Sequence, residues 1–138
     1  MLKDLSYGVI PLHYAKGSWR CYLVQHHHGN YWGFPKGHPD LQETEQECAQ
    51  RELKEETALD IIRWLDVEPL KEQYEFYYQG ALFHKTVIYF TALVTEGGQV
   101  DLREIKAGKW VDLDAVIHSL TYDGAKEMFR QVRMQLKI

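Results

Sequence analysis

The sequence predicts an α/β fold, a mixed β-sheet flanked by helices, and three observations support this class. Residues with high β propensity gather in several runs, of which residues 86–94 are the densest. Apolar residues recur at helical spacing in two other segments, 44–57 and 123–136. Predicted strands both precede and follow the first helix, which favours a mixed sheet with helices over a helical bundle or a β-sandwich.

The first half of the chain predicts two strands, a loop and a helix. Strands over 5–14 and 20–26 flank a turn at 15–18, where Gly17 interrupts the apolar pattern. Residues 27–41 are dense in glycine and proline and predict a loop. Residues 44–57 then predict a helix that buries Cys48, Ala49 and Leu53.

The second half predicts four more strands and a terminal helix. The strands are expected at 61–68, 70–78, 85–95 and, as a short one, 107–111. Asp123 is a suitable N-cap for the terminal helix. The apolar face of that helix consists of Ala125, Met128, Phe129, Val132 and Leu136.

Length and composition indicate one globular domain over residues 1–138. The chain has no repeat, linker or low-complexity segment, and 45% of its 138 residues are hydrophobic while 26% are charged. It contains two cysteines, too few for a disulfide-rich secreted scaffold. Without an apolar leader or a run long enough to cross a bilayer, we expect a cytoplasmic protein with no membrane partner. The sequence leaves the oligomeric state open and favours a monomer.

The negative charge is concentrated in one segment. The chain carries a net charge of −4, and residues 43–56 contain six glutamates against one arginine and one lysine, which is also −4. Like charges at helical spacing repel by a few tenths of a kcal/mol per pair. A bound divalent cation would offset this repulsion. The remainder is neutral and has no basic track, so a nucleic-acid partner is not expected.

Three of these glutamates predict a metal site. Glu55 and Glu56 follow Glu52 by three and four residues, so the three should converge on one face of the helix. Carboxylate oxygens are ligands that Mg²⁺ prefers. Gly37 is expected to allow a tight turn before the helix and to offer its carbonyl oxygen to the metal.

Arg51 precedes this acidic group and has a separate expected partner. It should lie on a different face of the helix from Glu52. From there its guanidinium can form a charge-assisted pair with the carboxylate of Glu43.

The spacing of these residues resembles the signature of the Nudix hydrolase family, Gly-x5-Glu-x7-Arg-Glu-U-x-Glu-Glu-x-Gly-U, where U is a bulky aliphatic residue. Every element matches except the second glycine, which is Ala58 here. In the family this glycine follows the catalytic helix, where a left-handed conformation is common. Ala58 therefore either adopts that conformation at a cost of about 1 kcal/mol, or the turn follows another route.

The resemblance implies the Nudix α/β/α sandwich and the Mg²⁺- or Mn²⁺-dependent hydrolysis of a nucleoside diphosphate linked to another moiety. The implied metal ligands are Gly37, Glu52, Glu55, Glu56 and Glu104, of which the last lies outside the signature and is otherwise an ordinary loop glutamate. The implied catalytic residues are Arg51, Glu52 and Glu55, with Glu55 as ligand or general base. Glu43 has an orienting role.

Two flanking segments, 32–38 and 85–90, are similar to those of the asymmetrical diadenosine tetraphosphate hydrolases. Lys36, His38 and Lys85 would then bind the polyphosphate, although Lys85 alternatively reads as a surface lysine at a hairpin end. The resemblance implies that Tyr78 and Tyr122 stack on adenine. The neighbours that could replace Tyr78 are Tyr74, Phe76 and Tyr77.

Three other functions remain open at this stage. One is removal of pyrophosphate from RNA 5′ ends, for which relatives typically have Gln where this chain has Lys36. Another is hydrolysis of a different nucleoside-diphosphate derivative. The third is a Nudix module that binds a nucleotide without cleaving it, but such modules usually lose carboxylates that this chain retains.

Overall fold

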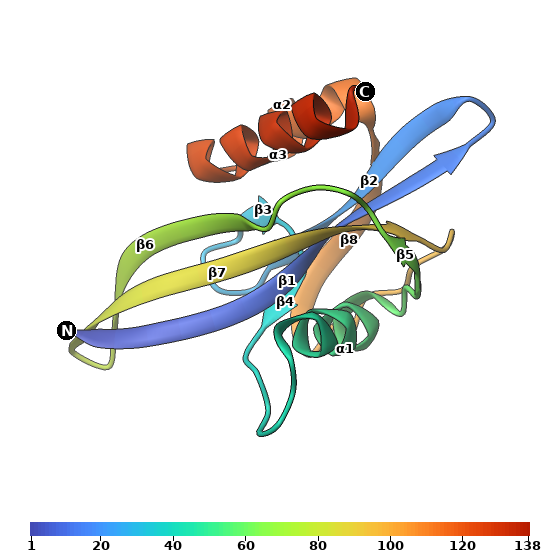
Figure 1. Cartoon of the computed structure of the whole chain (residues 1–138). Helices are drawn as coiled ribbons and strands as arrows, with labels where there is room; N and C mark the ends of the chain where they lie inside the picture. Colours follow the sequence, from blue (N-terminus) through green and yellow to red (C-terminus); the bar gives the residue numbers. More distant parts are fainter.

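The computed structural model describes residues 1–138 and contains an eight-stranded mixed sheet between helices on its two faces (Figure 1). The central strands β1 (Leu2–Ala15) and β7 (Ala81–Val94) pair in parallel, and every other pairing is antiparallel. Helix α1 (Glu45–Thr57) covers one face of the sheet, and α3 (Asp123–Leu136) covers the other. The fold is thus the α/β/α sandwich that the sequence predicts.

The remaining strands extend this centre on both sides. They are β2 (Ser18–His26), β3 (Trp32–Gly33), β4 (Lys36–Gly37), β5 (Ile61–Trp64), β6 (Leu70–Tyr78) and β8 (Ile105–Asp112). β2 and β4 pair with β1, β3 and β8 pair with β2, and β5 and β6 pair with β7. A 3-10 turn, η1 (Leu113–Ala115), and the short α2 (Val116–Ser119) connect β8 to α3.

The alternation of side chains along the central strands divides the core into two parts. Val9 on β1 and Phe90 on β7 belong to the cluster that packs Cys48, Ala49 and Leu53 of α1. Their neighbours Ile10 and Tyr89 belong to the opposite cluster, which contains the buried face of α3. Both helices are therefore fixed to the same pair of strands, because these strands are apolar on both faces.

The two ends of α1 have defined caps. Thr44 is the N-cap, and its hydroxyl accepts a hydrogen bond from the Glu47 backbone while the Glu47 carboxylate accepts one from the Thr44 backbone. At the other end Ala58 is left-handed, with φ 60° and ψ 12°, and its N–H donates to the carbonyl oxygen of Lys54 at 2.9 Å. Alanine thus adopts the conformation that the signature glycine favours, which decides between the two alternatives above.

Some predicted boundaries were wrong for local reasons. The strand expected over 61–68 ends at Trp64, because the register with β7 is irregular and the chain turns away after Leu65. β7 begins at Ala81 rather than at residue 85. Asp123 is the first residue of α3 rather than its N-cap, and Tyr122 occupies the cap position without a capping side chain.

Short elements escaped prediction because they contain too few residues to show a period. The expected loop over 27–41 includes the two-residue strands β3 and β4, and the segment before α3 includes η1 and α2. None of the helices is long and apolar enough to span a bilayer.

We predict that Ala58→Gly leaves the protein as stable as the wild type or stabilises it by up to about 1 kcal/mol. Glycine removes the strain of a left-handed alanine, while its greater freedom in the unfolded chain offsets part of the gain. Urea unfolding of both proteins measures the difference in free energy. A loss of about 1 kcal/mol in the variant would contradict the left-handed assignment.

Candidate functional site

Arg51 on α1 makes the expected pair with Glu43. Its Nε donates to Glu43 Oε2 at 2.6 Å and its Nη2 donates to Glu43 Oε1 at 3.0 Å, which is the two-point geometry that favours arginine over lysine. Nη2 also donates to the carbonyl oxygen of His38 at 2.9 Å. The bond from Arg51, together with a backbone N–H from Asp40, lowers the pKa of Glu43 to about 2.

The same guanidinium reaches two further carboxylates, contrary to the expectation that Arg51 and Glu52 lie apart. Nη1 donates to Glu52 Oε1 at 3.0 Å and to both oxygens of Glu55 at 3.1 and 3.2 Å. The guanidinium is planar and has five N–H donors, so it can bond one carboxylate along one edge and other carboxylates along a second edge. Arg51 therefore offsets part of the repulsion within the acidic segment.

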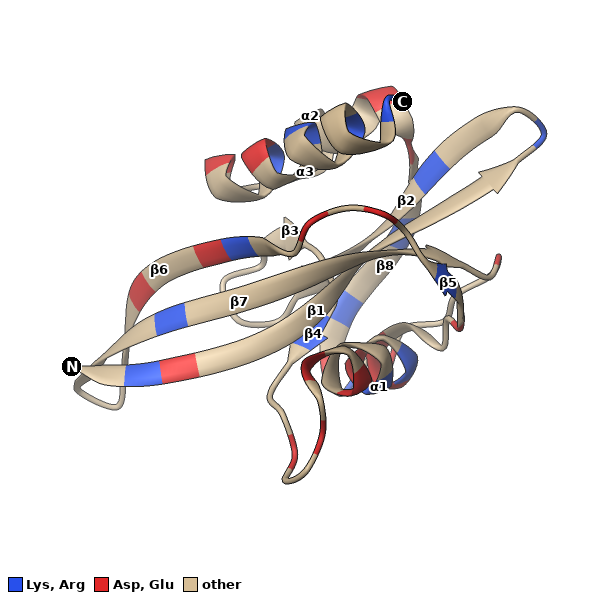
Figure 2. Ribbon diagram, in the orientation of Figure 1, with Lys and Arg blue, Asp and Glu red and all other residues tan.

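Three carboxylates form a cluster that fits a divalent cation. Glu52, Glu56 and Glu104 each place one oxygen so that the three atoms lie within 4.8 Å of one another. An all-oxygen set of this kind suits Mg²⁺ or Mn²⁺. Glu55 is outside the cluster, half exposed and bonded to Arg51, so only two of the three expected helix carboxylates converge. Figure 2 shows the concentration of acidic residues along α1 and the loop before it.

Glu56 is the buried member of this cluster. The residue is 5% exposed, and its Oε2 accepts the backbone N–H of Lys36 at 3.0 Å. Burial raises the pKa of Glu56 well above its ordinary value, the nearby Glu52 raises it further, and the charge of Lys36 opposes both. A cation at the cluster would favour the ionised form.

Gly37 is required for a reason other than the predicted tight turn. It lies in β4, paired with Tyr7, and its backbone is not left-handed. A Cβ atom at this position would collide with the carboxylate of Glu52. The absence of a side chain lets Glu52 approach the β4 backbone, while the Gly37 carbonyl oxygen accepts a weak bond from the Cys48 thiol at 3.7 Å.

Glu104 reaches the cluster because its loop is bound to the end of α1. The N–H of Gln99 donates to the carbonyl oxygen of Thr57 at 2.8 Å, and that of Asp101 donates to the carbonyl oxygen of Glu56 at 3.1 Å. Glu104 then donates its own N–H to the carbonyl oxygen of Asp101 at 3.0 Å. These backbone bonds place an exposed loop glutamate beside Glu52 and Glu56.

Lys85 is buried in the middle of β7, so its interpretation as a surface lysine at a hairpin end was wrong. Asp4 is its register partner on β1 and accepts a bond from its ammonium at 2.8 Å, and the hydroxyl of Ser6 accepts another at 2.6 Å. The other oxygen of Asp4 lies 2.8 Å from Nε2 of His38. Two of the three predicted phosphate-binding residues therefore share one acidic partner.

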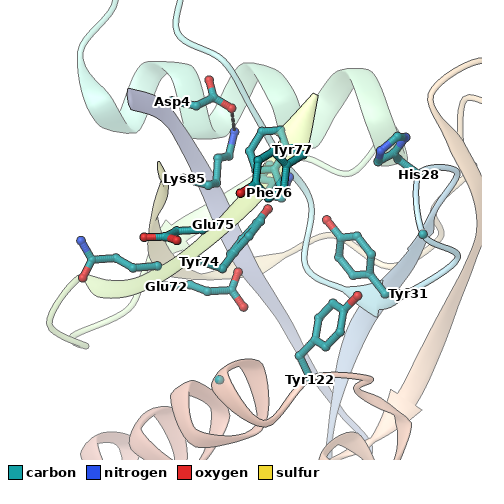
Figure 3. A pocket seen from close by; sticks show the side chains of 14 residues that line it. Asp4, His28, Tyr31, Glu72, Tyr74, Glu75, Phe76, Tyr77, Lys85 and Tyr122 are labelled. Atoms are coloured by element: carbon teal, nitrogen blue, oxygen red, sulfur yellow. Dashed lines mark hydrogen bonds and ion pairs between the residues drawn. The ribbon is translucent and has the colours of Figure 1, made fainter. Parts of the chain in front are cut away.

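A pocket of about 640 Å³ opens beside this group (Figure 3). Both Lys36 and Lys85 line it, together with Tyr31, Tyr74 and Tyr122. Burial, and then the charge of Lys85, lower the pKa of Lys36. The pocket thus joins two cations to an aromatic wall.

Only one of the two predicted stacking residues lines this pocket. Tyr122 does, and its ring lies 5.2 Å from that of Tyr31, a residue that the sequence did not single out. Tyr78 is at the end of β6, exposed, and packs against Phe83 instead. The three expected substitutes, Tyr74, Phe76 and Tyr77, all line the pocket.

Comparison with known proteins agrees with this architecture. The NUDIX domain family model matches residues 3–132. The crystal structure of a Caenorhabditis elegans Ap4A hydrolase binary complex superposes with a TM-score of 0.72 at 23% identity and covers 97% of this chain and 98% of that one. The NUDIX domain of Shewanella oneidensis NrtR, solved with ADP ribose, superposes with a TM-score of 0.78 at 20% identity and covers 99% and 90%.

Two curated relatives are more similar in sequence. The rat asymmetrical bis(5′-nucleosyl)-tetraphosphatase is 30% identical over 74% of this chain and 69% of its own length. The Arabidopsis thaliana mRNA-decapping enzyme subunit 2 is 34% identical over 69% of this chain, which spans 25% of that protein.

We predict that Glu56→Gln raises the melting temperature of the metal-free protein at neutral pH. The folded-state pKa of Glu56 is raised, so its contribution to stability is complete below its unfolded value of about 4.5 and is lost as the pH rises. The difference in melting temperature between the variant and the wild type should therefore grow as the pH increases above that value. Thermal unfolding in chelator from acidic to neutral pH measures it, and a less stable variant at neutral pH would contradict the prediction.

Proposed function

The chain belongs to the Nudix family and is an enzyme that acts on pyrophosphate bonds, and we propose that its substrates are dinucleoside tetraphosphates. The proposed reaction converts diadenosine tetraphosphate and water to ATP and AMP. The resemblance of segments 32–38 and 85–90 and the rat relative both support this substrate class. We further propose that it acts in the cytoplasm.

The observation that carries the proposal is the position of Lys36 between the acidic cluster and the aromatic pocket. Its backbone N–H binds the carboxylate of Glu56, while its side chain lines the pocket. The AMP end of the substrate would place its base in the pocket and its phosphorus at the carboxylate cluster, with Lys36 beside the bond to the remaining phosphates. This arrangement suits a substrate with a base, several phosphates and a hydrolysable bond.

We propose Mg²⁺ as the cofactor, with Mn²⁺ as a substitute. Glu52, Glu56 and Glu104 would hold the ion, and the carbonyl oxygen of Gly37 is a further candidate ligand beside Glu52. When bound, it would neutralise phosphate charge and make a coordinated water more acidic.

In this proposal Glu55 accepts the proton and Arg51 positions it. Glu55 is half exposed and outside the cluster, so its carboxylate is open to an attacking water, and we assign it as the proton acceptor. The Arg51 guanidinium, held by Glu43, positions Glu55 and Glu52 together. Arg51 acts as a positioning residue in this role.

Lys36, His38 and Lys85 are assigned to the leaving triphosphate. Lys36 donates no side-chain hydrogen bond within the protein and is available to phosphate oxygens. The ammonium of Lys85 and the ring of His38 are both bonded to Asp4, which holds them close together. Donors that are already oriented stabilise charge as it develops on the leaving group without reorganising.

Hydrolysis of an mRNA cap is a second candidate, favoured by the similarity to the Arabidopsis decapping subunit. A cap also contains a purine nucleotide in a polyphosphate bridge, so the pocket and cluster suit it chemically. An assay of capped RNA beside diadenosine tetraphosphate, with products separated by chromatography, ranks the two. A higher kcat/KM for capped RNA would replace the tetraphosphate proposal.

We predict that hydrolysis of diadenosine tetraphosphate in ¹⁸O-water places the label in AMP and not in ATP. Water attacks the phosphorus of the AMP end, its proton passes to Glu55, and the bond to the bridging oxygen of ATP breaks. Mass spectrometry of both products measures the label. AMP incubated with enzyme in the same water is the control for exchange, and label in ATP or formation of two ADP would overturn the regiochemistry.

A further inference from the structure

Two carboxylates that line the pocket, those of Glu72 and Glu75, have no role in the acidic cluster or the cation group. Glu75 is exposed, whereas Glu72 is half-buried. Glu72 of β6 lines the pocket between Tyr74 and Tyr122, as Figure 3 shows. Its carboxylate accepts no hydrogen bond from another residue, and the one charge that acts on it appreciably is that of Lys36. A half-buried carboxylate without a partner, among aromatic rings, is a group that a ligand can satisfy.

Burial and the charges around Glu72 act on its ionisation in opposite directions. Burial raises the pKa of Glu72, and the positive charge of Lys36 opposes this. The carboxylate also lies beside the start of α3, where Tyr122 provides no capping side chain and Gly124 leaves the approach open. The partial positive charge of a helix N-terminus stabilises a nearby anion. Glu72 therefore offers the pocket a hydrogen-bond acceptor with two oxygens.

We propose that Glu72 reads the Watson–Crick edge of the purine in the pocket and makes the site prefer guanine to adenine. This inference rests on the proposed function, since it requires a nucleoside end to occupy the pocket. Guanine presents two adjacent donors, N1–H and the N2 amino group, and a carboxylate can accept both. Adenine presents one donor, the N6 amino group, and beside it the acceptor N1. The second carboxylate oxygen would then face N1, and because both are acceptors they form no hydrogen bond.

The chemistry of glutamine predicts the opposite preference for Glu72→Gln. The side-chain amide has the same shape but offers one acceptor and one donor. That pair matches the N6 amino group and N1 of adenine. Glutamine also makes two bonds to adenine in nucleic-acid recognition, although there they go to N6 and N7. The substitution therefore changes hydrogen-bonding pattern and charge while it keeps the volume of the pocket.

The mixed dinucleotide adenosine–guanosine tetraphosphate gives an internal test. The nucleoside seated in the pocket leaves as the monophosphate, so the ratio of GMP to AMP reports which base was chosen. At about pH 8, where carboxylates are ionised, we expect the wild type to release about tenfold more GMP than AMP, the factor for one additional charged hydrogen bond. Glu72→Gln should release more AMP than GMP.

Glu68→Gln is the matched control, because Glu68 precedes β6 and lies exposed outside the pocket. It removes the same charge and should leave the product ratio unchanged. An AMP excess from the wild type, a ratio that Glu72→Gln leaves unchanged, or an equal shift in Glu68→Gln would overturn the assignment of Glu72.

Titration calorimetry with GMP and AMP separates this inference from the proposed function. If the mixed dinucleotide is not cleaved, the proposed function fails, but binding needs no turnover and still tests Glu72. Tighter binding of GMP by the wild type and of AMP by Glu72→Gln would support the inference in that case. Equal affinities in both proteins would overturn it.

Discussion

The guanidinium of Arg51 is the interaction on which the acidic side of the molecule depends. It donates to Glu43, Glu52 and Glu55, and each of these carboxylates would otherwise add its charge to a segment that already repels itself. Because Arg51 is bonded along both edges of its plane, the carboxylates that it holds have fixed directions. Glu52 points towards Glu56 and Glu104, whereas Glu55 remains at the surface.

The parallel pairing of β1 with β7 creates the second half of the site. It places Asp4 opposite Lys85, and Asp4 in turn holds His38 at the end of β4. The antiparallel pairing of β4 with β1 places Lys36 opposite Gly8, and there the backbone N–H of Lys36 meets the carboxylate of Glu56 on α1. The cation group and the carboxylate group are thus fixed relative to each other through the centre of the sheet.

The sequence predicted those features that depend on local spacing. The helix over 44–57 and the approach of Glu52 to Glu56 follow from separations of a few residues in an element of known period. The Arg51–Glu43 pair joins that helix to the residue just before its N-cap. The prediction for Gly37 identified the residue but not its reason, since the approach of Glu52 to its backbone appears only when β4 and α1 are packed together.

Features that depend on long-range contacts were beyond the sequence pattern. Asp4 and Lys85 are 81 residues apart, and nothing local to either indicates that they pair. The pocket takes Tyr31, Tyr74 and Tyr122 from three separate segments, whereas the resemblance assigned Tyr78 by its distance along the chain, and Tyr78 lies exposed at the end of β6. Glu72 was overlooked for the same reason, because its position between aromatic rings requires β6 and α3 to be adjacent.

The central claim is that the carboxylate cluster on α1 carries hydrolysis, and the turnover of Glu56→Gln tests it most directly. Rates on diadenosine tetraphosphate with Mg²⁺ should be measured for wild type and variant, with melting temperatures taken on the same samples. The account predicts that the variant is folded and retains less than about a tenth of the wild-type rate, since stabilisation of charge by a metal is worth several kcal/mol. A folded variant with a larger share of the rate would contradict it.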